Sequence, residues 1–283
     1  MKLNLKLPTP LDYFSTLVAS DHDFPLLEAS ASLAQDDYPE LSLQKVLGEV
    51  DFLLARLLRR LPASAQSMQR LKVLNQLLYQ DMGFAGNFNH YADPDNSYVH
   101  RVLETRQCIP VSMAVIWLEL ARGIGLEAYG VSFPGHFMLK VHLNEGQVVI
   151  DPLTGHSLSQ EALLEQLESM VGLSDGSDSL ALTLSHHLHA ASPRAIIARM
   201  LRNLKEIHSA EEDWPRLLAV QDRLLVLLPQ AWSEYRDRGM TLAVAGLLEP
   251  AVRDLETYLA HAGPTADHLV VAARVADLRR TAH

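Results

Sequence analysis

The sequence predicts an α+β fold with a helical N-terminal part and an all-helical C-terminal region. Two observations lead to this class. Apolar residues recur at three- and four-residue spacing before residue 80 and after residue 190, as on one face of an amphipathic helix. Between these regions, residues 135–143 and 147–152 form short runs in which side chains alternate or are β-branched, which is typical of strands.

Composition and charge limit the classes of function. The 283 residues are 48% hydrophobic, which suffices for a large core, and a formal net charge of -10 disfavours nucleic acid and anionic membranes as partners. No run of eighteen apolar residues suggests a membrane span, and Pro8, Pro10 and Asp12 interrupt any secretory leader. The single cysteine excludes an internal disulfide. We therefore expect a cytoplasmic protein.

The first domain is expected over residues 1–190, with helices over 1–80 and a core over 81–160. Helical spacing is clear in L-Q-K-V-L-G-E-V-D-F-L-L-A-R-L-L-R-R-L and in M-Q-R-L-K-V-L-N-Q-L-L-Y, with prolines marking the breaks. Residues 83–97 are rich in Gly, Asn, Asp and Pro, so they are expected to form a long ordered loop. Such loops often carry functional residues.

The only cysteine, Cys108, lies in R-Q-C-I-P-V-S-M-A-V-I-W-L-E-L-A-R, just before a predicted helix. Pro110 is favoured at the first helical position because it lacks an N–H and has a fixed φ. Ile109 is then the N-cap, and Cys108 lies outside the helix. Apolar residues surround most of the helix, and Gly123 with Gly125 ends it. We expect a buried helix whose positive end faces the thiol.

Two strands joined by a turn around Gly146 follow. His136 begins the first strand, and Asp151 ends the second. If a two-residue loop of Glu145 and Gly146 closes the hairpin, Asp151 lies opposite Lys140, four residues from His136. A hydrogen bond between the imidazole and the carboxylate then requires a bulge, a longer loop or strong twist.

Cys108, His136 and Asp151 together form a candidate thiol site. The thiolate is the nucleophilic species, and a helix N-terminus with a nearby imidazolium lowers the pKa of a thiol. In this interpretation His136 moves the proton and Asp151 orients the imidazole. The alternative is a buried structural cysteine, a histidine bonded at a strand end and an aspartate that starts a turn.

The order Cys, His, Asp resembles the transglutaminase-like (papain-like) fold, in which a cysteine caps a buried helix and the other two residues come from adjacent strands. Y-A-D-P-D-N-S-Y-V, the cysteine segment, F-P-G-H-F-M-L-K and I-D-P-L-T-G further resemble the SirB-type family of bacterial proteins. The resemblance is specific over residues 87–155. It implies a transglutaminase-like domain followed by a short tetratricopeptide region, with Asn96 and Gln107 supporting the site. Asn96 also suits a turn cap.

The C-terminal domain is expected over residues 191–283, after a Ser- and Asp-rich connection at 172–193. Trp214 begins a predicted helix. Pro229 and Pro264 are 35 residues apart, close to the tetratricopeptide period of ~34 residues. Since only one or two repeats fit, we expect them to pack on the N-terminal domain.

Two functions remain open. The first is a thiol enzyme in which Cys108 attacks an amide or acyl carbonyl, for hydrolysis or acyl transfer. The second is a catalytically silent regulatory protein that binds a partner peptide through its tetratricopeptide-like helices. We expect no cofactor, and no metal site, because L-S-H-H-L-H lacks the companion ligands and spacing of zinc sites. A protein or peptide partner is expected, and the oligomeric state is left open.

Overall fold

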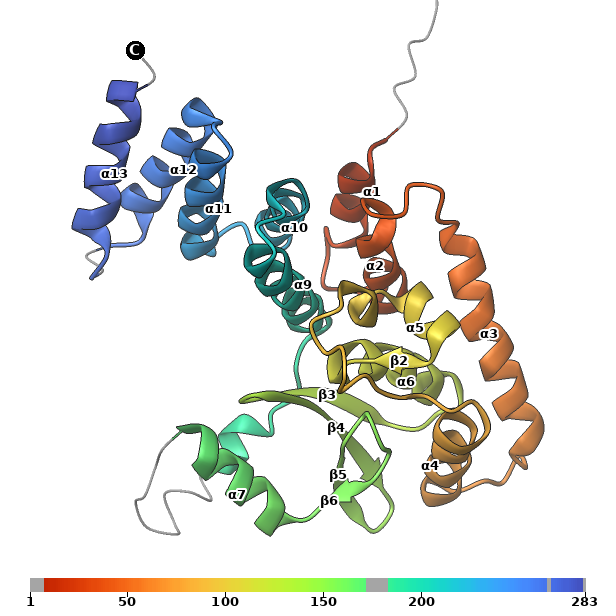
Figure 1. Cartoon of the computed structure of the whole chain (residues 1–283). Helices are drawn as coiled ribbons and strands as arrows, with labels where there is room; N and C mark the ends of the chain where they lie inside the picture. Colours follow the sequence, from red (N-terminus) through yellow and green to blue (C-terminus); the bar gives the residue numbers. More distant parts are fainter. Residues whose placement is uncertain (1–7, 172–182, 264–265, 282–283) are drawn as a thin grey trace, which may run out of the picture. The chain divides into compact units, whose positions relative to one another are not determined.

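The computed structural model describes residues 8–171, 183–263 and 266–281. Contacts between residues divide the chain into two compact units (Figure 1). We call one the sheet unit, Ser20–Met200, and the other the repeat unit, Met1–Ala19 with Leu201–His283. Each unit is described by itself.

Helix α9 (Pro193–Ala210) supplies residues to both units. Half of the expected connection between domains at 172–193, namely residues 172–182, lies outside the described part of the chain. Residues 183–187 are helical, and Leu184 is buried in a core cluster of the sheet unit. The domain division after residue 190 stays a prediction.

The N-terminal part of the sheet unit is helical, as the periodicity predicts. Its elements are α2 (Leu26–Ser32), η1 (Leu33–Gln35), α3 (Leu43–Arg60), α4 (Ser67–Asn75) and the π-helical η2 (Gln76–Asp81). Helix α3 buries a stripe at three- and four-residue spacing, made by Val46, Val50, Leu53 and Leu57. Pro62 follows the end of α3, where the sequence predicts a break.

The expected loop at 83–97 is ordered and contains two short elements, β1 (Ala85–Gly86) and η3 (Pro94–Ser97). Helix α5 (Val99–Thr105) follows it. Strand β2 (Gln107–Cys108) then pairs in parallel with β1. The loop is therefore tied by backbone hydrogen bonds to the segment that carries the cysteine.

A four-stranded antiparallel sheet has the order β3-β4-β5-β6. Its strands are β3 (Ala128–Phe133), β4 (His136–Leu143), β5 (Gly146–Ile150) and β6 (Ser157–Leu158). The sequence predicted only the second and third. On one face of β4, Met138 packs with Leu163 and Leu167 of α7 (Gln160–Val171). Alternation buries Phe137 and Leu139 on the opposite face.

Helix α6 (Pro110–Gly123) lies at the centre of the sheet unit and has the bounds that the sequence predicts (Figure 1). Ile109 is its N-cap, and Pro110 occupies the first turn. The helix packs against α2, α3, α4 and α5 and against strands β3 and β4. Its Trp117 side chain is 0% exposed, so α6 is a core helix, as its apolar surface indicates.

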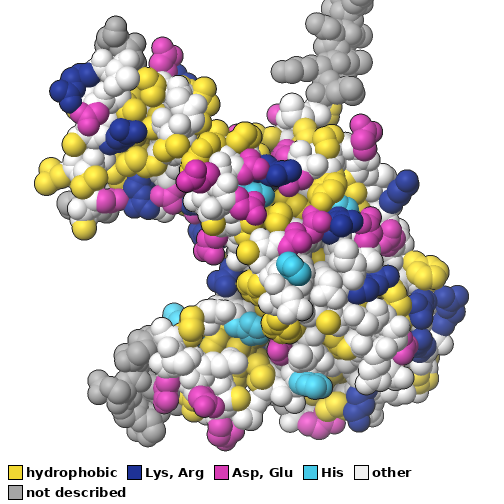
Figure 2. All heavy atoms as spheres, in the orientation of Figure 1, with side chains coloured by type: hydrophobic (Ala, Val, Ile, Leu, Met, Phe, Trp, Pro, Cys, Tyr) yellow, Lys and Arg dark blue, Asp and Glu magenta, His cyan; other side chains and the backbone are white. Residues whose placement is uncertain are grey.

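The described secondary-structure elements of the repeat unit are all helices. Its elements are α1 (Pro10–Leu17), the end of α9, α10 (Trp214–Leu227), α11 (Trp232–Val244), α12 (Leu248–His261) and α13 (His268–Thr281). Each helix from α10 to α12 packs on the next, and α1 packs on α10. On the face drawn in Figure 2, basic, acidic and hydrophobic side chains are interspersed over α11 to α13. Among the described helices, none combines the length and apolar content needed to span a bilayer.

The contact between α11 and α12 in the repeat unit depends on Gly239 of α11. A Cβ at this position would lie 2.8 Å from Leu255 Cγ and 3.2 Å from the carbonyl oxygen of Ala251, both in α12. By contrast, a Cβ at Gly48 in the exposed part of α3 would meet no atom within 4 Å. The two glycines therefore have opposite structural roles.

Gly239→Ala should destabilise the protein by about 1 to 3 kcal/mol because the added methyl group overpacks the α11–α12 contact. Gly48→Ala, the control, should stabilise it by about 0.5 to 1 kcal/mol because alanine is the better residue inside a helix. Thermal unfolding of both variants measures the effects. A Gly239→Ala variant that unfolds at the wild-type temperature would show that α12 moves away at no cost.

Candidate functional site

Cys108 ends strand β2, one residue before the N-cap of α6, and therefore lies outside the helix as predicted. Its strand partner is Gly86 in β1. The pairing holds the backbone of residues 85–87 over the thiol, because Ala85 N–H and Asn87 N–H donate to the carbonyls of Arg106 and Cys108. The loop at 83–97 thus forms one wall of the candidate site.

The Cys108 thiol is buried and protonated. The residue is 0% exposed, and its Sγ donates a hydrogen bond to the carbonyl oxygen of Ala85 at 3.2 Å. Burial, together with the negative charge of Asp151, raises the pKa of Cys108 to about 12. This direction is opposite to the one that an activated thiol requires.

His136 and Asp151 do meet. The imidazole Nε2 lies 3.5 Å from the carboxylate Oδ1, and both side chains are about one quarter exposed, at 25% and 24%. Burial alone would raise the pKa of Asp151. The hydrogen bonds from His136 and from the backbone N–H of Leu153, with the charges of His136 and His156, outweigh burial and lower it. The carboxylate is therefore ionised at neutral pH and oriented by two donors.

The predicted register of the β4–β5 hairpin was wrong, and the correction explains this contact. Leu143 pairs with Gly146, so Asn144 and Glu145 form the two-residue loop. The same register places Asp151 opposite Met138, two residues from His136 and not four. Diagonal neighbours in an antiparallel pair are about 7 to 8 Å apart, within reach of a histidine ring. No bulge is needed.

Sequence reasoning missed the polar side chains that hold the loop between β5 and β6, which we call the Asp151 loop. Tyr79 Oη donates to the carbonyl of Pro152 at 2.8 Å, and Asn75 Nδ2 donates to the carbonyl of Gly155 at 2.8 Å. Trp117 Nε1 in turn donates to Asn75 Oδ1 at 3.1 Å. Burial raises the pKa of Tyr79 well above its ordinary value, and nearby Cys108 and Asp151 add to this effect.

Asn96 and Ser112 join the loop to the start of α6. Asn96 is 2% exposed, and its side-chain amide donates to the carbonyl of His90 and accepts from Asn87. Ser112 Oγ donates to the carbonyl oxygen of Asn96 at 2.6 Å and accepts from the N–H of Ile109 at 3.2 Å. Asn96 therefore lies in η3, and its side chain bonds the backbone of the same loop, as the side chain of a turn residue does.

Gln107 is the neighbour of Cys108 in β2 and is half-buried. Its backbone N–H donates to Thr105 Oγ1 at 3.2 Å. The roles of Asn96 and Gln107 as supports for catalysis stay predictions. The catalytic roles of Cys108, His136 and Asp151 stay predictions as well.

The histidine-rich segment contains three imidazoles, and the ring centroid of His186 lies 5.8 Å from that of His187 and 5.6 Å from that of His189. His189 Nδ1 lies 2.7 Å from the carbonyl oxygen of His186. Within the described ranges, no three His, Cys, Asp or Glu side chains gather in a way that would hold a metal ion.

Asp151 does not end the second strand, as the sequence predicted, but follows directly after β5, which ends at Ile150. A cysteine before a buried helix, with a histidine on one strand and an aspartate directly after the neighbouring strand of an antiparallel sheet, defines the transglutaminase-like class of protein. Comparison with family models agrees. Residues 44–202 match the transglutaminase-like superfamily, and residues 204–278 match the tetratricopeptide repeat. The second match runs from α9 into α13 and confirms the predicted tetratricopeptide-like region.

The chain belongs to the transglutaminase-like superfamily and, within it, to the UPF0162 proteins. It is 34% identical to a UPF0162 protein of Xylella fastidiosa strain Temecula1, over 84% of each chain. A UPF0162 protein of Vibrio cholerae is 29% identical over 85% of this chain and 88% of its own length. One of Pseudomonas aeruginosa is 28% identical over 76% of each. No solved structure matches the chain.

At pH 8 the Cys108 thiol should react with a chromogenic disulfide about a thousandfold more slowly than free cysteine. A thiol with a pKa of about 12 has a far smaller thiolate fraction than one with the ordinary pKa of ~8.5. The same protein unfolded in guanidinium is the control and should react at the free rate. Equal rates for the folded and unfolded chains would contradict a buried thiol.

Ser112→Ala should lower the free energy of unfolding by about 1 to 3 kcal/mol, because it leaves the Ile109 N–H and the Asn96 carbonyl unpaired in a buried region. Urea denaturation followed by circular dichroism measures this change. Ser169→Ala on α7 is the matched control. Its hydroxyl makes an exposed bond to the Gln166 carbonyl, so its loss should change stability by less than about 0.5 kcal/mol. Equal effects of the two substitutions would refute a supporting role for Ser112.

Proposed function

We propose that this protein acts by binding a segment of a partner protein through its tetratricopeptide-like unit, with the transglutaminase-like unit as a scaffold without thiol chemistry. The observation that carries the proposal is the contrast between the two candidate sites. The only thiol is buried and protonated, whereas the repeat unit contains an open pocket with several charged and polar lining residues. The partner would be met in the cytoplasm, the compartment that the sequence predicts.

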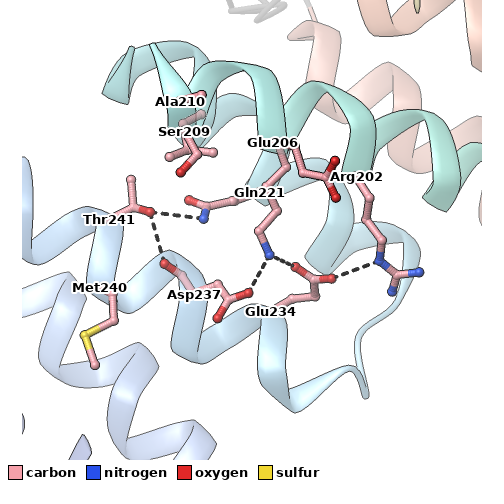
Figure 3. A pocket seen from close by; sticks show the side chains of 11 residues that line it. Arg202, Glu206, Ser209, Ala210, Gln221, Glu234, Asp237, Met240 and Thr241 are labelled. Carbon is pink, nitrogen blue, oxygen red and sulfur yellow. Dashed lines mark hydrogen bonds and ion pairs between the residues drawn. The ribbon is translucent and has the colours of Figure 1, made fainter. Parts of the chain in front are cut away.

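The pocket in the repeat unit has a volume of about 740 Å³ and is formed by α9, α10 and α11 (Figure 3). We call it the repeat pocket. Its lining residues are Arg202, Lys205, Glu206, Ser209, Ala210, Leu217, Gln221, Glu234, Asp237, Met240 and Thr241. A cavity of this size accommodates several side chains of a peptide, and its polar groups provide the directional bonds that give specificity. Stacked helical repeats typically bind their partners on such surfaces.

The thiol-enzyme hypothesis remains the second candidate, and the His136–Asp151 pair favours it. In this reaction Sγ of Cys108 would bond to an amide carbonyl carbon, its proton would pass through His136 to the leaving amine, and water or an amine would release the acyl group. Before it reacts, the thiol must break its hydrogen bond to the Ala85 carbonyl.

This reaction is tested by incubation with p-nitrophenyl acetate followed by measurement of the intact mass of the protein. An acyl adduct that both Cys108→Ala and His136→Ala abolish would support the reaction.

Selection from a random peptide library on the full chain tests the binding proposal. Wild type should enrich a peptide consensus, and Cys108→Ala should bind the same peptides with unchanged affinity. Ala210→Trp places an indole in the mouth of the repeat pocket and should weaken binding at least about tenfold, since it removes the space for a bound side chain. Fluorescence polarisation of the selected peptides measures the affinities.

The control for this variant is Ala273→Trp on the exposed side of α13, outside the repeat pocket, which should bind normally. The proposal fails if wild type enriches no consensus. It also fails if Ala210→Trp binds the selected peptides as tightly as wild type does.

A further inference from the structure

The repeat pocket has one acidic group more than basic groups. Its lining contains two cations, Arg202 and Lys205, and three carboxylates, Glu206, Glu234 and Asp237. Lys205 Nζ bonds both Glu234 Oε2 and Asp237 Oδ2, at 2.5 and 2.6 Å, and Arg202 Nε bonds Glu234 Oε1 at 3.3 Å (Figure 3). Among the described residues, Glu206 makes no ion pair. It is exposed at the edge of the pocket.

The two lining cations, Arg202 and Lys205, are already paired with carboxylates, so the pocket has little attraction for an anion. Lys205 is held between two carboxylates, and its side chain is only 18% exposed. Arg236, which is outside the lining, adds a bond to the second oxygen of Asp237 at 2.7 Å. Of the lining cations, only Arg202, 49% exposed, faces solvent, and Glu234 already neutralises it. A cationic ligand instead meets the unneutralised carboxylate of Glu206.

A second, independent feature points to the same ligand chemistry. Gln221 of α10 lines the pocket, is 1% exposed, and donates from Nε2 to Thr241 Oγ1 at 3.1 Å. The hydroxyl proton of Thr241 is used in a bond to the carbonyl of Asp237 at 3.0 Å, and the hydroxyl oxygen accepts the N–H of Gln221. The amide oxygen of Gln221, Oε1, has no donor in the described part of the chain.

A buried carbonyl oxygen without a donor is costly, and a ligand N–H that reaches it relieves the cost. Figure 3 shows the Gln221 side chain between α9 and α11, next to Ser209 and Thr241. The pocket thus has at its floor an acceptor without a donor, which neighbouring side chains cover in the free protein, and at its edge a carboxylate without an ion pair. Both demand a ligand that donates hydrogen bonds and carries a positive charge.

We propose that the repeat pocket binds a basic side chain, a lysine or an arginine, of the partner peptide. The proposal rests on the proposed function and specifies the residue type that the pocket recognises. Glu206 supplies the counter-charge, and Gln221 supplies the acceptor for one N–H of the bound side chain. Recognition of a cation by one charge and one neutral acceptor selects against acidic and apolar residues at this position of the partner.

The experiment is a nuclear magnetic resonance titration of the ¹⁵N-labelled full chain with three capped pentapeptides. Each peptide has two glycines on either side of a central lysine, norleucine or glutamate. The norleucine peptide keeps the length and apolar stem of lysine and lacks its charge. The lysine peptide should shift the side-chain amide signals of Gln221, assigned through Gln221→Leu, at concentrations at least about fivefold lower than the other two peptides do.

Two variants test the two features separately. Glu206→Gln, at an exposed position, should weaken lysine-peptide binding about twofold to fivefold and reduce its salt dependence. Gln221→Leu should weaken it about tenfold, measured on the backbone signals of the pocket. Glu165→Gln on α7 removes the same charge outside the pocket and should leave binding unchanged.

The inference is overturned if the norleucine or glutamate peptide binds as well as the lysine peptide, or if Glu206→Gln binds lysine normally. Absence of any pocket shift with the lysine peptide also overturns it. These outcomes are distinct from failure of the proposed function. Library peptides that bind wild type and not Ala210→Trp would still establish the repeat pocket as a peptide site, without a basic residue.

Discussion

The burial of α6 is the constraint on which the sheet unit depends. This helix is enclosed by α2, α3, α4 and α5 and by the sheet, and its Trp117 is fully buried. Two of its polar side chains bind residues outside the helix: the Trp117 indole N–H donates to Asn75, and Ser112 donates to the carbonyl of Asn96. The first bond links α6, through Asn75, to the Asp151 loop. The second links α6 to the loop at residues 83–97, which covers the thiol.

The same burial decides the state of Cys108. A helix N-terminus stabilises a negative charge by about 0.3 to 1 kcal/mol when it is exposed. Raising the thiol pKa from 9.0 to about 12 corresponds to ~4 kcal/mol against the thiolate. Desolvation therefore outweighs the helix dipole. The position that favours an activated cysteine in many enzymes here holds a neutral thiol that donates to a backbone carbonyl.

Sequence reasoning located α6 to the residue, because Pro110 and Gly123 mark its ends through local backbone chemistry. It also placed His136 at the start of one strand, whereas Asp151 lies one residue beyond the end of the neighbouring strand. It did not find β3, where Gly130 interrupts the apolar pattern. The hairpin register that it considered, with Glu145 and Gly146 as the loop, was wrong, because the loop residues are Asn144 and Glu145. The choice between adjacent registers depends on packing across the sheet.

The support of the Asp151 loop by Tyr79 and Asn75 was not foreseeable either. These contacts join residues 73 and 80 positions apart, and no local pattern encodes them. The burial of Cys108 likewise follows from the pairing of two strands, β1 and β2, of only two residues each. Residue types and spacing therefore suggest which side chains form a site. They do not predict the burial or hydrogen bonds of those side chains when distant segments of the chain supply them.

Because the only cysteine is buried and protonated, it also determines how the protein reacts with oxidants. Peroxides and disulfides react with the thiolate, so Cys108 resists conversion to sulfenic acid and mixed disulfides while the chain is folded. The native surface therefore has no redox-sensitive thiol among its described residues. A cysteine introduced anywhere on that surface would be the only reactive one, and a probe attached to it would report on that position alone.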